Sequence, residues 1–107
     1  MHEIVETNPY LRAAKIAKVS DDEMAQIVDY IAENPDIGEI MVGSGGCRKV
    51  RFARKGKGKS GGYRIVTYYS DLNNPVFLLW IFAKNRQENL NNAQITALSK
   101  SVKELIK

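Results

Sequence analysis

Apolar residues recur at helical spacing behind a polar, acidic start at Ser20-Asp-Asp-Glu23. They occupy positions i, i+3, i+4 and i+7 of one helix face: Met24, Ile27, Val28 and Ile31. This spacing predicts an amphipathic helix with one face turned towards a core. The start has the form of a capping box, with acidic residues at the positive end of the helix dipole. The helix is predicted to end near Asn34-Pro35, because a residue before proline avoids the helical region.

A shorter helix is predicted upstream, beginning at Asn8-Pro9 and running to about Lys18. Asn8 offers a capping side chain, and Pro9 lacks only an N–H that the first helical turn leaves unused. The expected packing face consists of Tyr10, Ala13, Ala14 and Ala17. The residues before this helix, Glu3–Glu6, are expected to form a short strand.

Three strands are predicted in the second half of the chain: Arg48–Arg54, Tyr63–Tyr69 and Val76–Ala83. The middle segment is rich in aromatic and β-branched residues, which favour strands. The last segment is apolar on both faces, as in a central strand that is covered on both sides. Two short glycine- or asparagine-rich segments, Lys55–Gly62 and Asp71–Pro75, connect them. Connections this short predict an antiparallel meander.

A closing helix is predicted from apolar residues at helical spacing: Ile95, Leu98, Val102 and Leu105. With no internal repeat and no composition break, the 107 residues form one predicted domain, 1–107. The expected fold class is α+β. The N-terminal helices pack on a twisted antiparallel sheet, and the C-terminal helix completes the domain.

The composition excludes several classes of protein. Hydrophobic residues make up 44% and charged residues 26% of the chain, which is typical of a globular domain. The single cysteine, Cys47, excludes an internal disulfide framework, and its expected state is a reduced, partly buried side chain. Apolar runs are too short to span a membrane, and the N-terminus lacks the pattern of a secretory signal. We therefore expect a cytoplasmic protein without a membrane partner.

The charge is unevenly distributed along the chain. Between Arg48 and Arg64 lie eight of the 16 basic residues and no acidic one, so the other eight face all 12 acidic residues. The segment therefore carries about +8 and the remainder about −4. A charge separated in this way predicts a polyanionic partner.

The predicted strands bring several of these cations to one place. Lys49 and Arg51 alternate with apolar residues, so they share one strand face. Arg64 begins the neighbouring strand, and Lys84 ends the central one. On one concave surface these side chains suit a phosphate backbone. The glycine-rich loop does not match a nucleotide-triphosphate motif, because it leads into a strand rather than a helix.

The basic segment contains lysine and arginine but no histidine and no set of metal ligands. Any chemistry on this surface therefore depends on its cations. RNA supplies its own nucleophile, the 2′-hydroxyl group. An enzyme then has to align that oxygen with the phosphorus, neutralise the phosphate oxygens and assist proton transfer. Lysine and arginine side chains can perform these tasks, and no cofactor is expected.

The ordered pattern GSGGCRKVRFARKGKGKSGGYRIVTYY, followed by LLWIFAKN and a final helix, resembles the RelE/HigB toxins of type II toxin–antitoxin modules. It is most similar to the HigB-like branch with a KGKGK loop. The resemblance covers most of the chain and implies a RelE-like fold. It also implies a metal-independent, ribosome-dependent endoribonuclease that cuts messenger RNA. An antitoxin, expected to be a small helix-turn-helix protein, would hold the toxin inactive.

The resemblance also implies roles for individual residues. By motif, the catalytic residues are Lys49, Arg51, Arg64 and Lys84. Residues expected to bind nucleic acid are Arg48, Arg54, Lys55, Lys57, Lys59 and Arg86. The chain departs from the RelE pattern at two places. Asn85 stands where RelE has an arginine, and Glu88–Asn92 lacks the tyrosine of the C-terminal segment.

Two other functions fit the same sequence. A ParE-like toxin of the same fold would act on DNA gyrase through protein contacts. A non-catalytic RNA-binding module would bind RNA in a salt-sensitive manner without cleaving it. In an endoribonuclease or in a non-catalytic RNA-binding module, three tyrosines are candidates for stacking on unpaired bases: Tyr63, Tyr68 and Tyr69.

Overall fold

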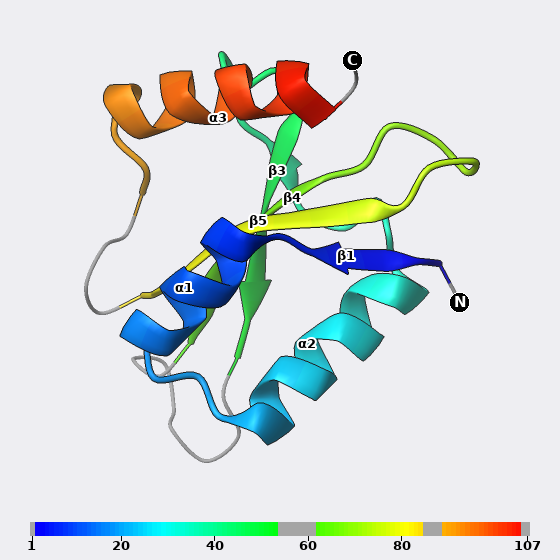
Figure 1. The fold of residues 1–107 in the computed structure, drawn as a ribbon, viewed down its shortest axis with the longest axis vertical. Helices are drawn as coiled ribbons and strands as arrows, with labels where there is room; N and C mark the ends of the chain where they lie inside the picture. Colours follow the sequence, from blue (N-terminus) through cyan, green and yellow to red (C-terminus); the bar gives the residue numbers. More distant parts are fainter. Residues whose placement is uncertain (1, 54–61, 85–88, 106–107) are drawn as a thin grey trace.

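The computed structural model describes residues 2–53, 62–84 and 89–105. In chain order its elements are β1 (Ile4–Glu6), α1 (Asn8–Ile16), α2 (Asp21–Glu33), β2 (Glu39–Ile40), β3 (Cys47–Phe52), β4 (Tyr63–Tyr68), β5 (Val76–Ala83) and α3 (Asn92–Leu105) (Figure 1). Of the connecting loop predicted at Lys55–Gly62, only Gly62 falls within these ranges. No helix formed by the described residues is long and apolar enough to cross a membrane.

The strands form one sheet in the order β1-β5-β4-β3-β2. Strands β3, β4 and β5 are antiparallel neighbours, which confirms the predicted meander. Strand β1 joins the free edge of β5 in parallel, so the sheet is mixed rather than purely antiparallel. The two-residue strand β2, which the sequence pattern did not predict, pairs with β3 at the other edge. The α+β class is confirmed.

Helix α1 begins one residue earlier than its sequence pattern predicts. The N-cap is Thr7 rather than Asn8, because the Thr7 hydroxyl accepts a hydrogen bond from the N–H of Tyr10. The same hydroxyl donates to the carbonyl of Leu78 at 2.7 Å, and the Thr7 N–H donates to that carbonyl as well. Pairing with β5 therefore holds Thr7 extended, as a cap residue must be.

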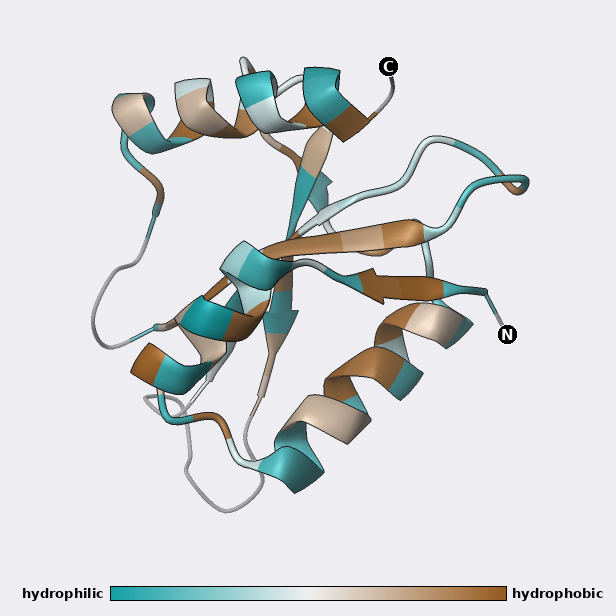
Figure 2. Cartoon of the chain, viewed as in Figure 1, coloured by the Kyte–Doolittle hydropathy of each residue, from teal (hydrophilic) through white to brown (hydrophobic). Residues whose placement is uncertain are grey.

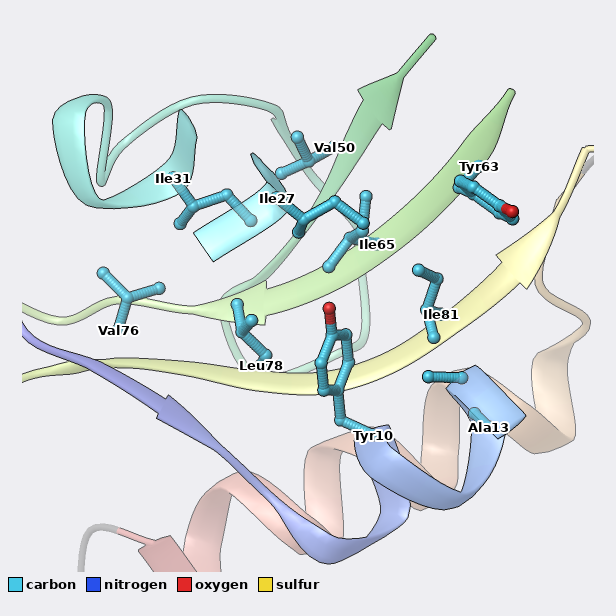
Figure 3. Packing of buried hydrophobic residues seen from close by; sticks show 11 residues of the cluster. Tyr10, Ala13, Ile27, Ile31, Val50, Tyr63, Ile65, Val76, Leu78 and Ile81 are labelled. Atoms are coloured by element: carbon cyan, nitrogen blue, oxygen red, sulfur yellow. The ribbon is translucent and has the colours of Figure 1, made fainter. Parts of the chain in front are cut away.

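Helix α2 has the predicted cap and the predicted buried face. The Ser20 side chain accepts from the N–H of Glu23, and the Glu23 carboxylate accepts from the N–H of Ser20. Ile27 and Ile31 are fully buried. Together with Tyr10 of α1 they pack on one face of the sheet (Figure 3). Burial, together with the nearby Glu6 carboxylate, raises the pKa of Tyr10 far above its ordinary value.

Helix α3 covers part of the other face of the sheet, opposite α1 and α2 (Figure 1). Leu98 and Val102 pack there against Val66 of β4 and Cys47 of β3. Strand β5 therefore lies between two apolar layers and is hydrophobic along its length, as its sequence predicted (Figure 2). The helix is capped by Asn91, whose side-chain oxygen accepts from the N–H of Gln94 at 2.8 Å.

A tight turn connects α2 to the edge of the sheet at Gly38. This residue has φ +101°, and a Cβ atom there would lie 2.7 Å from the carbonyl oxygen of Lys49. The Arg48 guanidinium donates to the carbonyls of Asp36 at 2.9 Å and Gly38 at 3.3 Å. The turn therefore lies close against the β3 backbone at Lys49, and the Arg48 side chain holds it by two hydrogen bonds.

Candidate functional site

Two arginines face each other on neighbouring strands of the sheet, one pair from the end of the β3–β4 ladder. Arg51 of β3 and Arg64 of β4 are direct cross-strand partners. Such partners have Cα atoms about 4.5–5.5 Å apart and side chains on the same face. Like charges placed directly opposite destabilise a sheet. An anion bound between them would be attracted to both guanidinium groups.

The two arginines differ in their exposure. Arg51 is exposed, whereas the Arg64 side chain retains only 5% of its accessible surface. One Arg64 guanidinium nitrogen lies 3.4 Å from the carbonyl oxygen of Tyr63. Arg64 is also opposite Phe82 of β5, so its stem lies beside an aromatic ring position on the same face. The sequence placed Arg64 at the site but gave no indication that it is buried.

Lys49 lies on the same face as Arg51, as the alternation predicted, and it has a partner that the sequence did not predict. The Lys49 ammonium donates to the side-chain oxygen of Asn89 at 2.7 Å. Asn89 belongs to the segment between β5 and α3, 40 residues away along the chain. Glu39 of β2 is the direct cross-strand partner of Lys49, which brings one carboxylate to the rim of this face.

Lys84 extends the ladder by one pair beyond the end of β5. Its N–H donates to the carbonyl of Gly62 at 2.9 Å. Phe82 is the cross-strand partner of Arg64, so the two side chains share a face. Alternate residues of a strand also share a face, so Lys84 lies on the same face as Phe82 and Arg64. Strand register therefore brings Lys49, Arg51, Arg64 and Lys84 onto one face from three adjacent strands. We call these four residues the cationic cluster.

The other predicted nucleic-acid contacts do not join this cluster in the described structure. Arg48 belongs to the opposite face, and its guanidinium binds the turn at Asp36 and Gly38. The alternation that separated Lys49 from Val50 carried this signal, because Arg48 and Val50 share a face. The remaining residues lie outside the described ranges: Arg54, Lys55, Lys57, Lys59 and Arg86.

The buried tyrosine and cysteine are not available for chemistry on this face. Tyr63 is in the core, 1% exposed, with its hydroxyl 3.2 Å from the Glu23 carboxylate, so it cannot stack on a base. Tyr68 and Tyr69 are half-buried. Cys47 is a free thiol, as predicted, but it is fully rather than partly buried, and burial raises its pKa to about 11. It is therefore protonated and unreactive near neutral pH.

The cluster has the chemistry of a phosphate-binding surface. Arginine forks bind phosphate oxygens in a fixed plane, and lysines provide compact positive charges beside them. Over the part of the chain that the structure describes, no three His, Cys, Asp or Glu side chains gather to hold a metal ion. Among the described residues of this face, the lysines and the Glu39 carboxylate at its rim are candidates for an acid–base step.

Two comparisons with known proteins match this chain over nearly its whole length. A family model described as "RelE toxin of RelE / RelB toxin-antitoxin system" matches residues 2–107. Among solved structures, a mutant of the E. coli toxin RelE in the free state superimposes with a TM-score of 0.56 at 18% sequence identity. The match covers 94% of this chain and 96% of that one, which shows a shared fold.

Proposed function

Because this chain belongs to the RelE family of toxins, we propose that it cleaves messenger RNA on the ribosome as the toxin of a toxin–antitoxin module. The observation that carries the proposal is the cross-strand pairing of Arg51 with Arg64 on one face of the sheet. Two guanidinium groups side by side on one face can both bind the oxygens of one bridging phosphodiester. A surface of this kind is suited to bind an RNA backbone rather than a neutral ligand.

In the proposed reaction, the 2′-hydroxyl oxygen of the substrate attacks the adjacent phosphorus and the bond to the 5′-oxygen breaks. The products are a 2′,3′-cyclic phosphate and a 5′-hydroxyl group, so no water and no oxidant are consumed. Arg51 and Arg64 hold the non-bridging oxygens and neutralise the charge that develops on them. Lys49 and Lys84 assist the transfer of the proton from the 2′-oxygen to the leaving oxygen.

We further propose that this chemistry is metal-independent. The substrate provides the nucleophile, and the four cations of the cluster provide the charge that a divalent ion supplies in other nucleases. An unchanged single-turnover cleavage rate when calcium or manganese partly replaces magnesium, at a total concentration that keeps the ribosome intact, supports this part of the proposal. A strict requirement for one added divalent ion at the cleavage step contradicts it.

The expected partners follow from the same reading. The ribosome presents messenger RNA to the cationic cluster, and the basic residues between Arg54 and Lys59 are proposed to bind ribosomal RNA electrostatically. We propose that the neutralising antitoxin is a small helix-turn-helix protein encoded beside the toxin. When the antitoxin is bound, the cationic cluster cannot reach the decoding site of the ribosome.

A translation assay tests the proposed function. We expect purified toxin, added to a reconstituted translation system, to produce discrete cuts within the translated region of a messenger RNA, mapped by primer extension. The same RNA without ribosomes is expected to stay intact. Arrested growth with intact transcripts and accumulated gyrase–DNA complexes would instead indicate a topoisomerase poison. Salt-sensitive ribosome binding without any cut would indicate a non-catalytic binding module.

Asn89 is expected to act as a positioning residue through Lys49. Replacing Asn89 with alanine removes the 2.7 Å hydrogen bond that orients the Lys49 ammonium. We expect the single-turnover cleavage rate to fall about 10-fold or more, with little change in affinity for the ribosome. Asn92, exposed at the start of α3, provides a matched control, and Asn92→Ala should cleave normally. A normal rate in Asn89→Ala would remove this role.

A further inference from the structure

One carboxylate lies at the edge of the face that carries the cationic cluster. Strands β2 to β5 contain a single acidic residue, Glu39 of β2. Glu39 is exposed and is the direct cross-strand partner of Lys49. Cross-strand partners share a face, as do alternate residues of one strand, so Glu39 lies on the same face as Lys49 and Arg51. These four strands therefore add one carboxylate to a face whose other charged side chains are cations.

The register of β2 against β3 sets the distance between Glu39 and the arginines. Met41 donates its N–H to the Cys47 carbonyl at 2.9 Å, so residues 41 and 47 form a hydrogen-bonded pair. Alternate pairs of the ladder are hydrogen-bonded, so Glu39 and Lys49 form another, with Cα atoms about 5.5 Å apart. Arg51 is then a diagonal neighbour of Glu39, about 7–8 Å away, a separation that long side chains can bridge.

The two arginines of the cluster are closer to each other than Glu39 is to either. The bond from the Lys84 N–H to the Gly62 carbonyl makes residues 62 and 84 a hydrogen-bonded pair. Arg64, two positions along, therefore turns its N–H and C=O towards β5. Its pair with Arg51 on the other side is then a non-hydrogen-bonded one, in which Cα atoms are about 4.5 Å apart. A phosphate held by both guanidinium groups has a fixed position relative to Glu39.

Glu39 and Lys84 lie on opposite sides of this phosphate position. Cross-strand pairs on the face follow one another in rows about 7 Å apart: the row of Lys49, the row of Arg51 and Arg64, and the row of Gly62 and Lys84. Glu39 ends the first row on β2, and Lys84 ends the third row on β5. The arginine pair lies between them. In an in-line displacement at phosphorus, the attacking and leaving oxygens also lie on opposite sides.

The two kinds of side chain are suited to opposite proton transfers. Near neutral pH a carboxylate is ionised and accepts a proton, whereas an ammonium group carries a proton that it can donate. Within residues 2–53, 62–84 and 89–105, the Glu39 carboxylate has no hydrogen-bond or ion-pair partner. The Lys49 ammonium beside it donates to Asn89. The carboxylate is therefore available to a substrate hydroxyl group.

We propose that Glu39 is the general base of the cleavage reaction. This inference rests on the proposed function, which supplies RNA as the substrate. The Glu39 carboxylate takes the proton of the 2′-hydroxyl group while the 2′-oxygen bonds to the phosphorus. The bond between the phosphorus and the 5′-oxygen breaks, and the Lys84 ammonium gives that oxygen a proton. Proton exchange with water then restores both side chains, so the cycle consumes no further reactant.

Single-turnover cleavage on ribosomes programmed with a defined messenger RNA tests the proposal. Glu39→Gln keeps the size of the side chain and removes the proton acceptor. At saturating toxin we expect its rate to be about 10²–10³-fold below that of the wild type. Affinity for the ribosome should stay the same or rise, because the RNA then meets one negative charge fewer. A wild-type rate in Glu39→Gln overturns the proposal.

Two further variants separate catalysis from a general effect of charge. Glu33→Gln makes the same change at an exposed residue at the end of α2, the helix on the opposite face of the sheet. We expect it to cleave within about twofold of the wild type. Glu39→Asp keeps a carboxylate on a shorter stem, so its rate should lie between those of the wild type and Glu39→Gln. Equal losses in Glu39→Gln and Glu33→Gln overturn the proposal.

A substrate with sulfur in place of the scissile 5′-oxygen distinguishes the base from the acid. A thiolate leaves without first gaining a proton, because thiols are far stronger acids than alcohols. On this RNA we expect Lys84→Met to recover most of its lost rate, while Glu39→Gln stays about 10²-fold slower than the wild type. Recovery in Glu39→Gln assigns the carboxylate to the leaving oxygen and overturns its role as base.

The wild-type chain separates this inference from the proposed function. Cleavage by the wild type together with normal cleavage by Glu39→Gln leaves the endoribonuclease standing and overturns the general base. A wild-type chain that cuts no messenger RNA on the ribosome overturns both.

Discussion

Replacing Arg64 with methionine is expected to reduce messenger-RNA cleavage about 10²–10³-fold, the usual effect of losing one preorganised contact to developing charge. Methionine keeps most of the buried volume of the arginine stem and removes only the guanidinium. Because methionine fills most of the volume of the buried stem, we expect the free energy of unfolding to fall less than in a variant that leaves a cavity at this position. Single-turnover cleavage and chemical unfolding measure the two effects separately.

Two further variants of Arg64 sharpen this test. Arg64→Ala should lose both cleavage and stability, because the side chain is only 5% exposed and its removal leaves a cavity. Arg64→Lys keeps the charge but loses the planar fork, so an intermediate rate is expected. If Arg64→Met cleaves at the wild-type rate, Arg64 supports the sheet and has no part in the reaction.

Replacing Gly38 with alanine is expected to lower the free energy of unfolding by about 3 kcal/mol. The residue has φ +101°, which disfavours any side chain, and the new Cβ would meet the Lys49 carbonyl oxygen at 2.7 Å. Both the turn and the β3 backbone would have to move. Urea unfolding followed by circular dichroism measures the loss against a total stability of about 5–15 kcal/mol.

Gly43 provides the matched control for Gly38. It also has a positive φ, +84°, but the nearest atom to an added Cβ is a methyl carbon of Ile95 at 3.6 Å. Gly43→Ala should therefore lose only the conformational term, about 1 kcal/mol. If the free energy of unfolding falls by the same amount in both variants, the contact between the new Cβ atom and the Lys49 carbonyl oxygen adds no destabilisation.

Local patterns along the chain were sufficient to predict most of the elements. Helix α2 and strand β5 begin and end where capping, proline and hydrophobic runs indicate. The parallel pairing of β1 with β5 was not predictable, because it joins segments about 70 residues apart and leaves no mark on either. Strand β2 was missed because two exposed residues carry no periodicity.

The same limit applies to the candidate site. Alternation placed Lys49 and Arg51 on one face, and strand adjacency added Arg64 and Lys84. The contact between Lys49 and Asn89, and the approach of Glu39 to Lys49, depend on three-dimensional proximity that spacing does not report. The burial of Arg64 runs against the ordinary preference of arginine for the surface and was not predictable from its residue type.

The pairing of β5 with both β4 and β1 has a consequence for the timing of biosynthesis. Chains fold as they emerge, at synthesis rates of about 5–20 residues per second. The sheet stays open at its centre until residues 76–83 have been made, and Lys84 and Asn89 follow still later. The proposed RNA-binding surface is therefore complete only after the last quarter of the chain, which contributes Lys84 and Asn89, has been made. A nascent chain that has not yet reached these residues cannot form the complete surface.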